Sequence, residues 1–330
     1  MNAIIWTHYG PPEVLQLQEV AAPTPKDGEV LVKIHAAGVT AGDCEMRRMQ
    51  LPLGLSLPMR LYVGLRRPRR VTILGQELAG EVAALGPGVT NFAVGDPVIA
   101  ATGFGFGAYA AYTCLPAGGD AAGGTAVLAP KPPNLTDAEA ATLPVGGLEA
   151  LHFLRHANVR PGESLLINGG GGSIGTLALQ LAKHYGAEVT AVDAPGKLAM
   201  LRGLGADHVI DYTQEDFTRR GQAYDIIFDV VGKSPFGRSL RALRPGGRYL
   251  LGNPRVATLV RGWWATKTSD KQVITATSAA RGADLLQLAE LAAAGTLKPV
   301  IDRTYPLAEA AAAHCYVETG QKAGSVALTL

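Results

Sequence analysis

A run of glycines follows an apolar segment near the middle of the chain. Within this run, a G-x-G-x-x-G pattern lies between a strand-like stretch, 164–168, and an amphipathic stretch, Ile174–Tyr185. Residues without Cβ permit a tight turn and let backbone N–H groups approach a pyrophosphate, and a helix N-terminus adds a partial positive charge. Strand, loop and helix together favour a dinucleotide site over a flexible turn. The residues expected to bind the pyrophosphate are Gly170, Gly172, Ser173, Ile174 and Gly175.

An acidic residue follows at the distance expected for ribose recognition. Asp193 comes 18 residues after Gly175, at the end of the next strand-like run. A carboxylate there can accept hydrogen bonds from both ribose hydroxyls and repels a 2′-phosphate, so NADH is favoured over NADPH. Lys197 would partly neutralise the site, which leaves NADPH possible. Asp193 would also serve as a helix N-cap, and the two roles are compatible.

The histidines and cysteines do not form a recognisable metal site. His152 and His156 are four residues apart, as two zinc ligands on a helix would be, but Phe153 replaces the glutamate of H-E-x-x-H. We therefore expect no bound zinc. The three cysteines are far apart and odd in number, which indicates no disulfide framework and fits a reducing cytoplasm. No G-x-S-x-G elbow appears, which disfavours an α/β-hydrolase.

Composition is typical of a soluble globular protein. The 330 residues are 47% hydrophobic and 18% charged, with a net charge of +2. This near balance favours neither a nucleic-acid nor a membrane partner. The one basic cluster, Arg66, Arg67, Arg69 and Arg70, is interpreted as a solvated loop. No apolar run is long enough to span a membrane and the start lacks a signal-peptide pattern, so we expect a cytoplasmic protein.

Two kinds of patterning divide the chain. The first third has short strand-like runs separated by Gly/Pro turns, and the part after Pro130 alternates strands with helices. Such alternation predicts a parallel sheet with crossover helices, the α/β doubly wound dinucleotide fold. The early strands are predicted at 30–35, 75–85 and 98–101, and a loop at 117–125. The later strands are predicted at 164–168, 188–192, 208–210, 225–231, 248–252, 273–277, 298–300 and 325–330. Further helices are predicted at 137–142, 148–156 and 283–293.

Several motifs, taken in order, resemble one superfamily. They are Gly38-Val39-Thr40-Ala41-Gly42-Asp43, Leu74 to Val82, Val94 to Val98, Leu143 to Leu148, the glycine run, and Leu204 to Tyr212. The chain resembles the medium-chain dehydrogenase/reductase superfamily, and within it the zinc-independent quinone oxidoreductases of the zeta-crystallin type. The resemblance implies a Rossmann doubly wound parallel sheet inserted in a GroES-like β-rich catalytic domain. It places the catalytic domain at 1–128, completed by 278–330, the Rossmann domain at 129–277, and the active site in the cleft between them.

Departures from the zinc enzymes of this superfamily indicate the mechanism. Those enzymes carry Cys where this chain has Thr40 and His where it has Gln76, and no third ligand appears near 143–145. Without three protein ligands a catalytic zinc is not expected. Carbonyl polarisation would then come from hydroxyls, backbone donors or water. Quinones and enones suit such a site because their conjugated acceptors need less activation.

The resemblance also assigns roles to residues outside the glycine run. Thr40 and Asp43 are expected near the nicotinamide as catalytic residues, although Asp43 would also suit a helix cap. Glu149 occupies a position where relatives often have Thr near the cofactor, so an acid there is unexpected. Tyr212 is expected at the adenine end. The segments expected to line the nicotinamide site contain Val231, Gly232, Leu251, Gly252 and Asn253.

The function expected from these features is hydride transfer from NAD(P)H to a quinone or α,β-unsaturated carbonyl, with NADH favoured. Two alternatives stay open: an NAD(P)-dependent alcohol dehydrogenase or ketone reductase on the same fold, and a non-catalytic nucleotide-binding or crystallin-like protein. The resemblance also implies a homodimer that extends the sheet through 273–277. The substrate itself is not encoded in a recognisable pattern.

Overall fold

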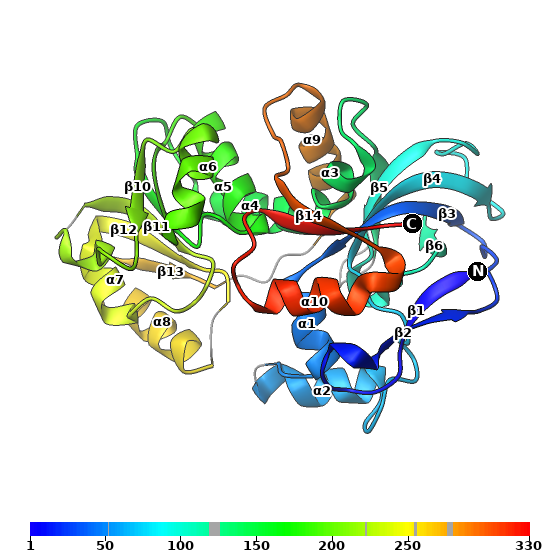
Figure 1. The fold of residues 1–330 in the computed structure, drawn as a ribbon. Coiled ribbons are helices and arrows are strands. Elements are labelled where there is room, and N and C mark those ends of the chain that lie inside the picture. Colours follow the sequence, from blue (N-terminus) through cyan, green and yellow to red (C-terminus); the bar gives the residue numbers. More distant parts are fainter. Residues whose placement is uncertain (52, 119–125, 222, 254–255, 276–279) are drawn as a thin grey trace. The chain divides into compact units, whose positions relative to one another are not determined.

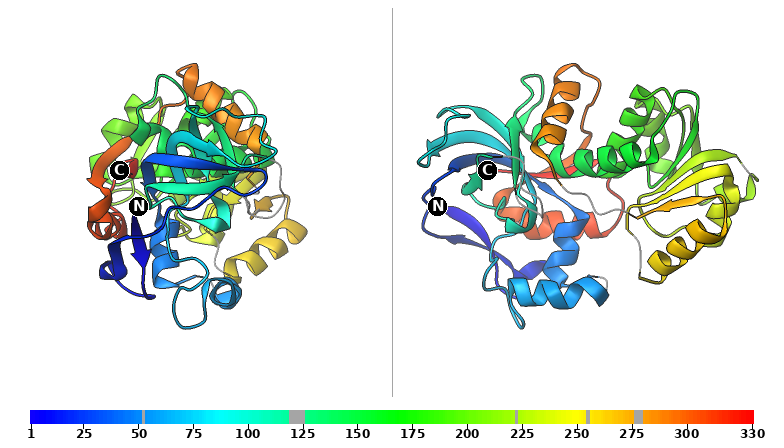
Figure 2. Two further views of the ribbon diagram at one scale, coloured as in Figure 1. Left: turned by 90° about the vertical axis from the view of Figure 1, so that its right-hand side faces the viewer. Right: turned by 180° about the vertical axis from the view of Figure 1, so that it is seen from behind.

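Two compact units emerge in the computed structural model, which describes residues 1–51, 53–118, 126–221, 223–253, 256–275 and 280–330 (Figures 1 and 2). The first unit contains Met1–Leu148 and Ala279–Leu330, and the second contains Glu149–Ser278. The division falls inside a helix, α4 (Pro144–Ala157). The sequence patterns place the start of the Rossmann domain earlier, at 129.

The first unit is built on an open, mostly antiparallel sheet with strand order β14-β15-β3-β4-β5-β7, and β6 pairs with β3. A separate ribbon of β1 and β2 joins it through bridges at Ala3–Ala110 and Ile5–Ile73. The strands are β1 (Asn2–Trp6), β2 (Leu15–Glu19), β3 (Glu29–Val39), β4 (Glu77–Leu85), β5 (Pro97–Ala101), β6 (Tyr112–Pro116), β7 (Val127–Pro130), β14 (Ile301–Pro306) and β15 (Ser325–Thr329).

Helices complete the first unit. They are α1 (Ala41–Arg48), α2 (Leu53–Val63), α3 (Asp137–Ala141), α9 (Gly282–Ala293) and α10 (Ala310–Glu318). Helix α10 contacts α1, β14 and β15, and Figures 1 and 2 show α10 beside α1 although the two are far apart in sequence. The core between sheet and helices is apolar, with Trp6, Leu74 and Leu78 among its fully buried side chains. The last stretch of the chain therefore closes the unit that the first third begins.

The second unit is a six-stranded parallel sheet with the order β10-β9-β8-β11-β12-β13. Its strands are β8 (Ser164–Asn168), β9 (Glu188–Asp193), β10 (His208–Asp211), β11 (Tyr224–Asp229), β12 (Leu243–Leu251) and β13 (Gln272–Ile274). Its helices after α4 are α5 (Ser173–His184), α6 (Leu198–Gly203), α7 (Phe236–Ala242) and α8 (Val256–Thr268). Strand order reverses direction between β8 and β11, which is the switch point where doubly wound sheets bind ligands.

Right-handed crossovers place the helices on both faces of this sheet. Helices α5 and α6 connect strands that run toward β10, whereas α7 and α8 connect strands that run toward β13. Because both sets of connections have the same hand, they must cover opposite faces. This arrangement confirms the predicted α/β doubly wound fold.

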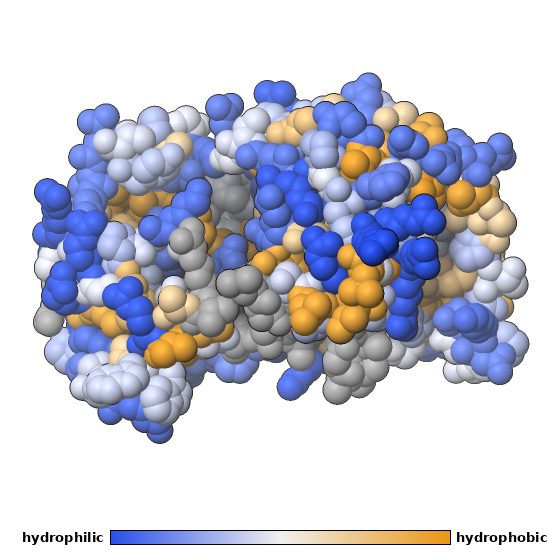
Figure 3. Space-filling model, turned by 90° about the horizontal axis from the view of Figure 1, so that it is seen from below, coloured by the Kyte–Doolittle hydropathy of each residue, from blue (hydrophilic) through white to orange (hydrophobic). Residues whose placement is uncertain are grey.

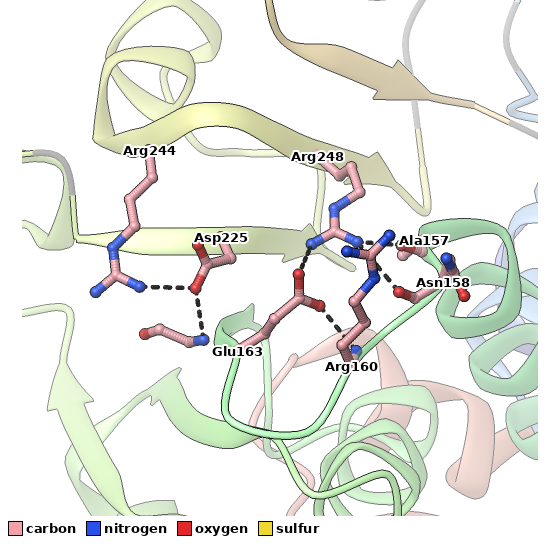
Figure 4. A network of polar contacts seen from close by, with 8 residues as sticks. Ala157, Asn158, Arg160, Glu163, Asp225, Arg244 and Arg248 are labelled. Atoms are coloured by element: carbon pink, nitrogen blue, oxygen red, sulfur yellow. Dashed lines mark hydrogen bonds and ion pairs between the residues drawn. The ribbon is translucent and has the colours of Figure 1, made fainter.

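Ion pairs hold the amino ends of the strands, opposite the edge where the glycine run lies (Figure 4). Asp225 accepts a hydrogen bond from the Ser164 N–H at 2.9 Å and from Arg244 at 2.7 Å. Arg248 pairs with Glu163 and donates to the Ala157 carbonyl at 2.6 Å. These bonds join β8, β11 and β12 at one end and leave the carboxyl ends available.

Most predicted elements are confirmed, with shifted ends. Helix α4 begins at Pro144, four residues before its predicted start, because proline is well suited to the first turn of a helix. The strand predicted at 298–300 is wrong: β14 begins at Ile301, and Pro299 has no N–H to donate to a ladder. Part of the predicted loop 117–125 and the end of the predicted strand 273–277 lie outside the described residues. None of the helices in the described part of the chain is long and apolar enough to cross a membrane.

Candidate active site

The glycine run forms a tight turn between β8 and α5 in the second unit. Gly169 has φ +88°, and a Cβ there would lie 2.3 Å from a methyl group of Val231. This contact brings the loop after β8 against the loop after β11, at the reversal in strand order. Gly175 packs so closely that a Cβ would lie 2.2 Å from the Gly169 carbonyl oxygen. Only glycine allows this approach of helix and loop.

Gly172 differs from Gly170 and Gly175 because the space beside its Cα is empty. It is the N-cap of α5, and a Cβ at this position would have the Gly169 oxygen, 3.8 Å away, as its nearest neighbour. No side chain caps this helix, so Ser173 and Ile174 begin it with backbone groups alone. The turn therefore combines a helix N-terminus with space beside it, which suits an anionic group such as a pyrophosphate.

Asp193, at the end of β9, is hydrogen-bonded to the glycine loop and to the next residue in its own loop. Its Oδ2 accepts the Gly171 N–H at 2.7 Å, and its Oδ1 accepts the Ala194 N–H at 2.8 Å. Lys197 Nζ lies 3.2 Å from Oδ1, and both side chains are about nine-tenths buried. A Cβ on Gly171 would meet both the lysine and the carboxylate, which explains the third consecutive glycine. Asp193 and Lys197 thus form an ion pair with no net charge, and Asp193 holds the glycine loop through its bond to Gly171.

Asp229, which the sequence reasoning missed, organises the loop after β11. Its buried carboxylate accepts hydrogen bonds from Asn168 Nδ2 and the Gly232 N–H, both at 2.9 Å, and from Tyr249 at 3.1 Å. Ser234 donates to it as well. These donors come from β8, β12 and the loop itself. An acid directly after the buried apolar run Ile226–Phe228 was the available signal.

The residues predicted to line the nicotinamide end lie at the carboxyl ends of β11 and β12, with different exposure. Gly232 has φ +67°, and a Cβ there would lie 2.4 Å from the Asn253 oxygen, so these two segments touch. Val231 is 40% exposed. The side chain of Leu251 belongs to the sheet core, so only its backbone is available at this edge. Gly252 donates its N–H to the Asp229 carbonyl at 3.0 Å.

The two remaining predicted cofactor residues lie away from these loops in sequence. Tyr212 follows β10, is 60% exposed, and donates its N–H to the Asp193 carbonyl at 3.4 Å. The adenine-end position expected for it thus adjoins Asp193. Glu149 lies on α4, and burial raises its pKa to about 7. It can carry or release a proton near neutrality.

A second group of predicted residues forms a hydrogen-bonded cluster in the first unit. Thr40 caps α1: its Oγ1 accepts the Asp43 N–H at 3.0 Å, and its own N–H donates to Asp43 Oδ2 at 3.0 Å. The Thr40 hydroxyl donates to the same carboxylate oxygen at 2.7 Å. Asp43 Oδ1 accepts the Gly75 N–H at 3.3 Å. Asp43 is fully buried, whereas Thr40 is partly exposed.

The cluster continues inward through an aromatic pair that the sequence did not indicate. The Tyr109 hydroxyl hydrogen-bonds Asp43 and lies 3.2 Å from His314 Nε2. His314 Nδ1 in turn lies 3.4 Å from Cys44 Sγ. We call Thr40, Asp43, Gln76, Tyr109 and His314 the Thr40 cluster. No local sequence pattern predicts this cluster, since Tyr109 and His314 are 205 residues apart.

Burial dominates the electrostatics of the cluster. It raises the pKa of Asp43 to about 6, against the opposing hydrogen bonds from Thr40 and Gly75. It lowers the pKa of His314 to about 3, with a contribution from Arg47, so the imidazole is neutral. Burial also raises the pKa of Glu77 to about 8; its Oε2 accepts the Val145 N–H at the start of α4 at 2.8 Å. The protonation states of these two carboxyl groups therefore change near neutral pH.

The two positions where zinc enzymes carry ligands lie together in this cluster. Thr40 Oγ1 is 3.3 Å from Gln76 Oε1, so a hydroxyl and an amide occupy them. Across the described ranges, no three His, Cys, Asp or Glu side chains gather as a metal site would require. The rings of His152 and His156 are tilted by 43° with centroids 4.2 Å apart, and the His156 Nδ1 lies 2.8 Å from the His152 carbonyl oxygen. Their spacing is accounted for by contacts within α4.

Family comparisons agree with both units. Residues 26–122 match the alcohol dehydrogenase GroES-like domain, and residues 204–328 match the family described as zinc-binding dehydrogenase. A 2-methylene-furan-3-one reductase of Solanum lycopersicum is 33% identical over 345 residues, covering 99% of this chain and 79% of that protein. A chloroplastic NADPH-dependent alkenal/one oxidoreductase of Arabidopsis thaliana is 30% identical, covering 99% and 78%.

A solved structure extends the similarity to the whole backbone. The quinone oxidoreductase from Coxiella burnetii superposes with a TM-score of 0.87 at 30% sequence identity, covering 100% of this chain and 99% of that one. Together with the two reductases, it shows that the similarity spans both units of the chain.

Proposed function

The chain belongs to the medium-chain dehydrogenase/reductase superfamily, and from this premise we propose that it is a zinc-independent reductase of quinones or α,β-unsaturated carbonyl compounds that uses NAD(P)H. The observation that carries the proposal is the glycine loop, closed against the loop after β11 and open beside Gly172. The substrate class follows from the relatives, whose names specify alkenals, a methylene-furanone and quinones.

The second unit would hold the dinucleotide. Gly170, Gly172, Ser173, Ile174 and Gly175 would bind its pyrophosphate through backbone groups. Asp229 fixes the loop that contains Gly232, so this loop is preorganised for the nicotinamide end. When bound, the reduced nicotinamide supplies the hydride.

Either form of the cofactor fits, and we propose a modest preference for NADH. The Asp193 carboxylate retains lone pairs for a ribose hydroxyl although it accepts hydrogen bonds from the Gly171 and Ala194 N–H groups. Lys197 neutralises it, so repulsion of a 2′-phosphate is weaker than for a free carboxylate. The preference should accordingly be smaller than Asp193 considered alone would indicate.

The Thr40 cluster would supply the proton and the polarising hydrogen bond in place of a metal. Thr40 is partly exposed, as is Gln76, and its hydroxyl would contact the substrate oxygen; Asp43 is a positioning residue that acts through Thr40. With Asp43 protonated, its hydroxyl donates to Thr40 Oγ1, and the Thr40 hydroxyl is free to donate outward. Because the pKa of Asp43 is about 6, this arrangement is populated on the acid side of neutrality.

The protein should also form a homodimer through strand β13. This short strand ends the parallel sheet and pairs with β12 on one side. An open sheet edge is a ready site for pairing with a second copy. Sedimentation velocity would report the association state.

Substrate-dependent oxidation of NADH and NADPH tests the reductase proposal. We expect turnover with a benzoquinone and with a 2-alkenal, little turnover with a saturated ketone or a secondary alcohol, and no loss after treatment with a chelator. Metal analysis should find well under one zinc per chain. Activity confined to alcohols and ketones would instead identify an alcohol dehydrogenase, and cofactor binding without turnover of any acceptor would identify a binding protein.

A further inference from the structure

Positive charge is concentrated in one segment of the first unit. Residues 46–76 contain seven arginines and no acidic residue, while the whole chain has a net charge of only +2. The rest of the chain is therefore net acidic. The sequence alone suggests that the cluster Arg66, Arg67, Arg69 and Arg70 is a solvated loop without a further role.

This arginine loop is held in place at the end of helix α2. Gly64, at φ +146°, turns the chain so tightly that a Cβ would lie 2.1 Å from the Arg67 carbonyl oxygen. The Val63 carbonyl then accepts the N–H groups of Arg69 and Arg70 at 3.0 and 3.1 Å. The backbone therefore presents the arginines in a defined arrangement beside the helix.

The arginines of this loop form no ion pairs with the residues that the structure describes. Among the described residues, no ion pair involves Arg66, Arg67 or Arg69, and all three are exposed. Arg70 lies over the ring of Tyr62, 4.5 Å from its centroid. Arg60, on α2 itself, lies over Tyr9. The positive charge is thus directed outward and not neutralised within the unit.

Large apolar side chains are exposed beside these charges. Leu57 and Leu61, one helical turn apart on α2, are 60% and 65% exposed, and Leu65 in the loop is 60% exposed. Seen from below Figure 1, where α2 is the lowest element of the first unit, hydrophobic surface lies directly beside strongly hydrophilic surface (Figure 3). We call Leu57, Leu61, Leu65, Arg66, Arg67 and Arg69 the α2 patch.

We propose that the α2 patch docks the protein on the surface of a membrane rich in anionic lipids. The leucines would enter the boundary between headgroups and acyl chains, while the guanidinium groups stay at the level of the phosphates. A nucleic acid would engage the arginines but give the leucines no role. A second copy docked on the same patch about a twofold axis would bring arginines against arginines, which is repulsive.

Vesicle co-sedimentation of the full chain tests this proposal without reference to catalysis. Vesicles of phosphatidylcholine alone are compared with vesicles containing about three parts in ten of phosphatidylglycerol. We expect at least tenfold tighter binding to the anionic vesicles, weakened by salt. Arg66→Ser with Arg67→Ser and Arg69→Ser should weaken it by about thirtyfold to a hundredfold, because each arginine near such a surface contributes about fivefold.

Matched control variants distinguish an effect of the α2 patch from a general loss of positive charge or of exposed apolar surface. Arg202→Ser with Arg241→Ser and Arg281→Ser removes the same number of exposed charges elsewhere and should change binding less than about threefold. Leu57→Ser with Leu61→Ser should weaken binding about tenfold and leave its salt dependence unchanged. The control pair Val260→Ser with Leu286→Ser should leave the affinity for vesicles unchanged. Circular dichroism checks that each variant is folded.

The proposal fails if anionic lipid does not increase binding, or if the control arginines matter as much as the patch. It also fails if the leucine pair has no effect, since arginines alone would indicate a soluble polyanion or an acidic protein. A concentration-dependent dimer that the leucine variant abolishes, without vesicle binding, would identify a second copy as the occupant.

Discussion

The Thr40 cluster of the first unit and the glycine loop of the second hold their functional atoms by opposite means. In the cluster, buried side chains hydrogen-bond one another, and Asp43 alone contacts Thr40, Gly75 and Tyr109. In the loop, what matters is the absence of side chains, because Cβ atoms at Gly171 or Gly175 would collide with neighbours.

This difference determines how each region can be damaged. The cluster is vulnerable to the removal of a polar group, since a buried partner left unpaired loses both its hydrogen bond and its hydration. The loop is vulnerable to the addition of carbon atoms, since under the proposed function the open space beside Gly172 receives the cofactor. Substitutions in the two regions should therefore differ in whether stability or binding changes first.

The largest effect is expected from Gly172→Val. The site around Gly172 is open, so the fold should tolerate the side chain, but the valine would fill the space that the pyrophosphate needs. We expect NADH affinity to fall at least about a thousandfold, measured by calorimetry, with a nearly unchanged melting temperature. Gly203→Val, at another position with open surroundings but outside the segments that would hold the cofactor, is the control. Near-normal affinity for the Gly172 variant would remove the loop from the cofactor site.

The next effect concerns the pH dependence of stability and arises beside the Thr40 cluster. Glu77 keeps its proton in the folded state up to a pKa of about 8, whereas its ordinary value is 4.5. The folded state therefore binds more protons between these values, and the free energy of unfolding falls as pH rises through this window. Glu77→Gln should remove this loss, which over the whole window is on the order of 5 kcal/mol.

Denaturant titrations from pH 5 to pH 9 measure this slope. In Glu77→Gln the free energy of unfolding should still decline slightly with rising pH, because the pKa of Asp43 is also raised, to about 6. This smaller decline should end near pH 6. Glu81→Gln is the control, because the hydrogen bond and charge of Lys33 lower the pKa of that exposed carboxyl. An unchanged slope above pH 6 in the Glu77 variant would mean that Glu77 is ionised in the folded protein.

A smaller effect is expected from Thr40→Val, which removes the hydroxyl at the exposed end of the cluster. The value of kcat/KM for an enone at pH 6 should fall about tenfold to fiftyfold, since one hydrogen bond and one proton path are lost. Thr40→Ser should retain most activity. Wild-type kcat/KM should decline above pH 6 as Asp43 ionises, and the Val variant should lack this decline. Identical pH profiles for the two proteins would limit Thr40 to capping α1.

The smallest effect is expected at Asp193. Asp193→Ser should shift the ratio of kcat/KM for NADH over NADPH toward NADPH by less than about tenfold, because Lys197 already offsets the carboxylate. Asp193→Asn keeps an acceptor for the Gly171 N–H while removing the charge. Equal shifts in both variants would assign the preference to charge, and no shift in either would leave Asp193 as a brace of the loop.

Local pattern was sufficient for much of this molecule. The strand 164–168, the glycine pattern and the helix after it are confirmed almost residue for residue, because each depends on neighbours in sequence. The six-stranded parallel sheet followed from the regular alternation of strands and helices. Thr40 and Asp43 came from a family resemblance and lie together because they are three residues apart at a helix N-terminus.

The partners of those residues required the folded chain. Asp229 collects donors from Asn168, Ser234 and Tyr249, and Tyr109 meets His314 across 205 residues. Packing likewise determines that Asp193 forms an ion pair with Lys197 and that leucines are exposed beside the arginine loop. The sequence by itself was sufficient to predict a dinucleotide site at the glycine run and to predict that no zinc is bound, since both predictions depend on residue type and local geometry. Only the tertiary structure decided which carboxyl groups are buried, paired or protonated, because desolvation and hydrogen bonding depend on residues that the chain brings together from far apart.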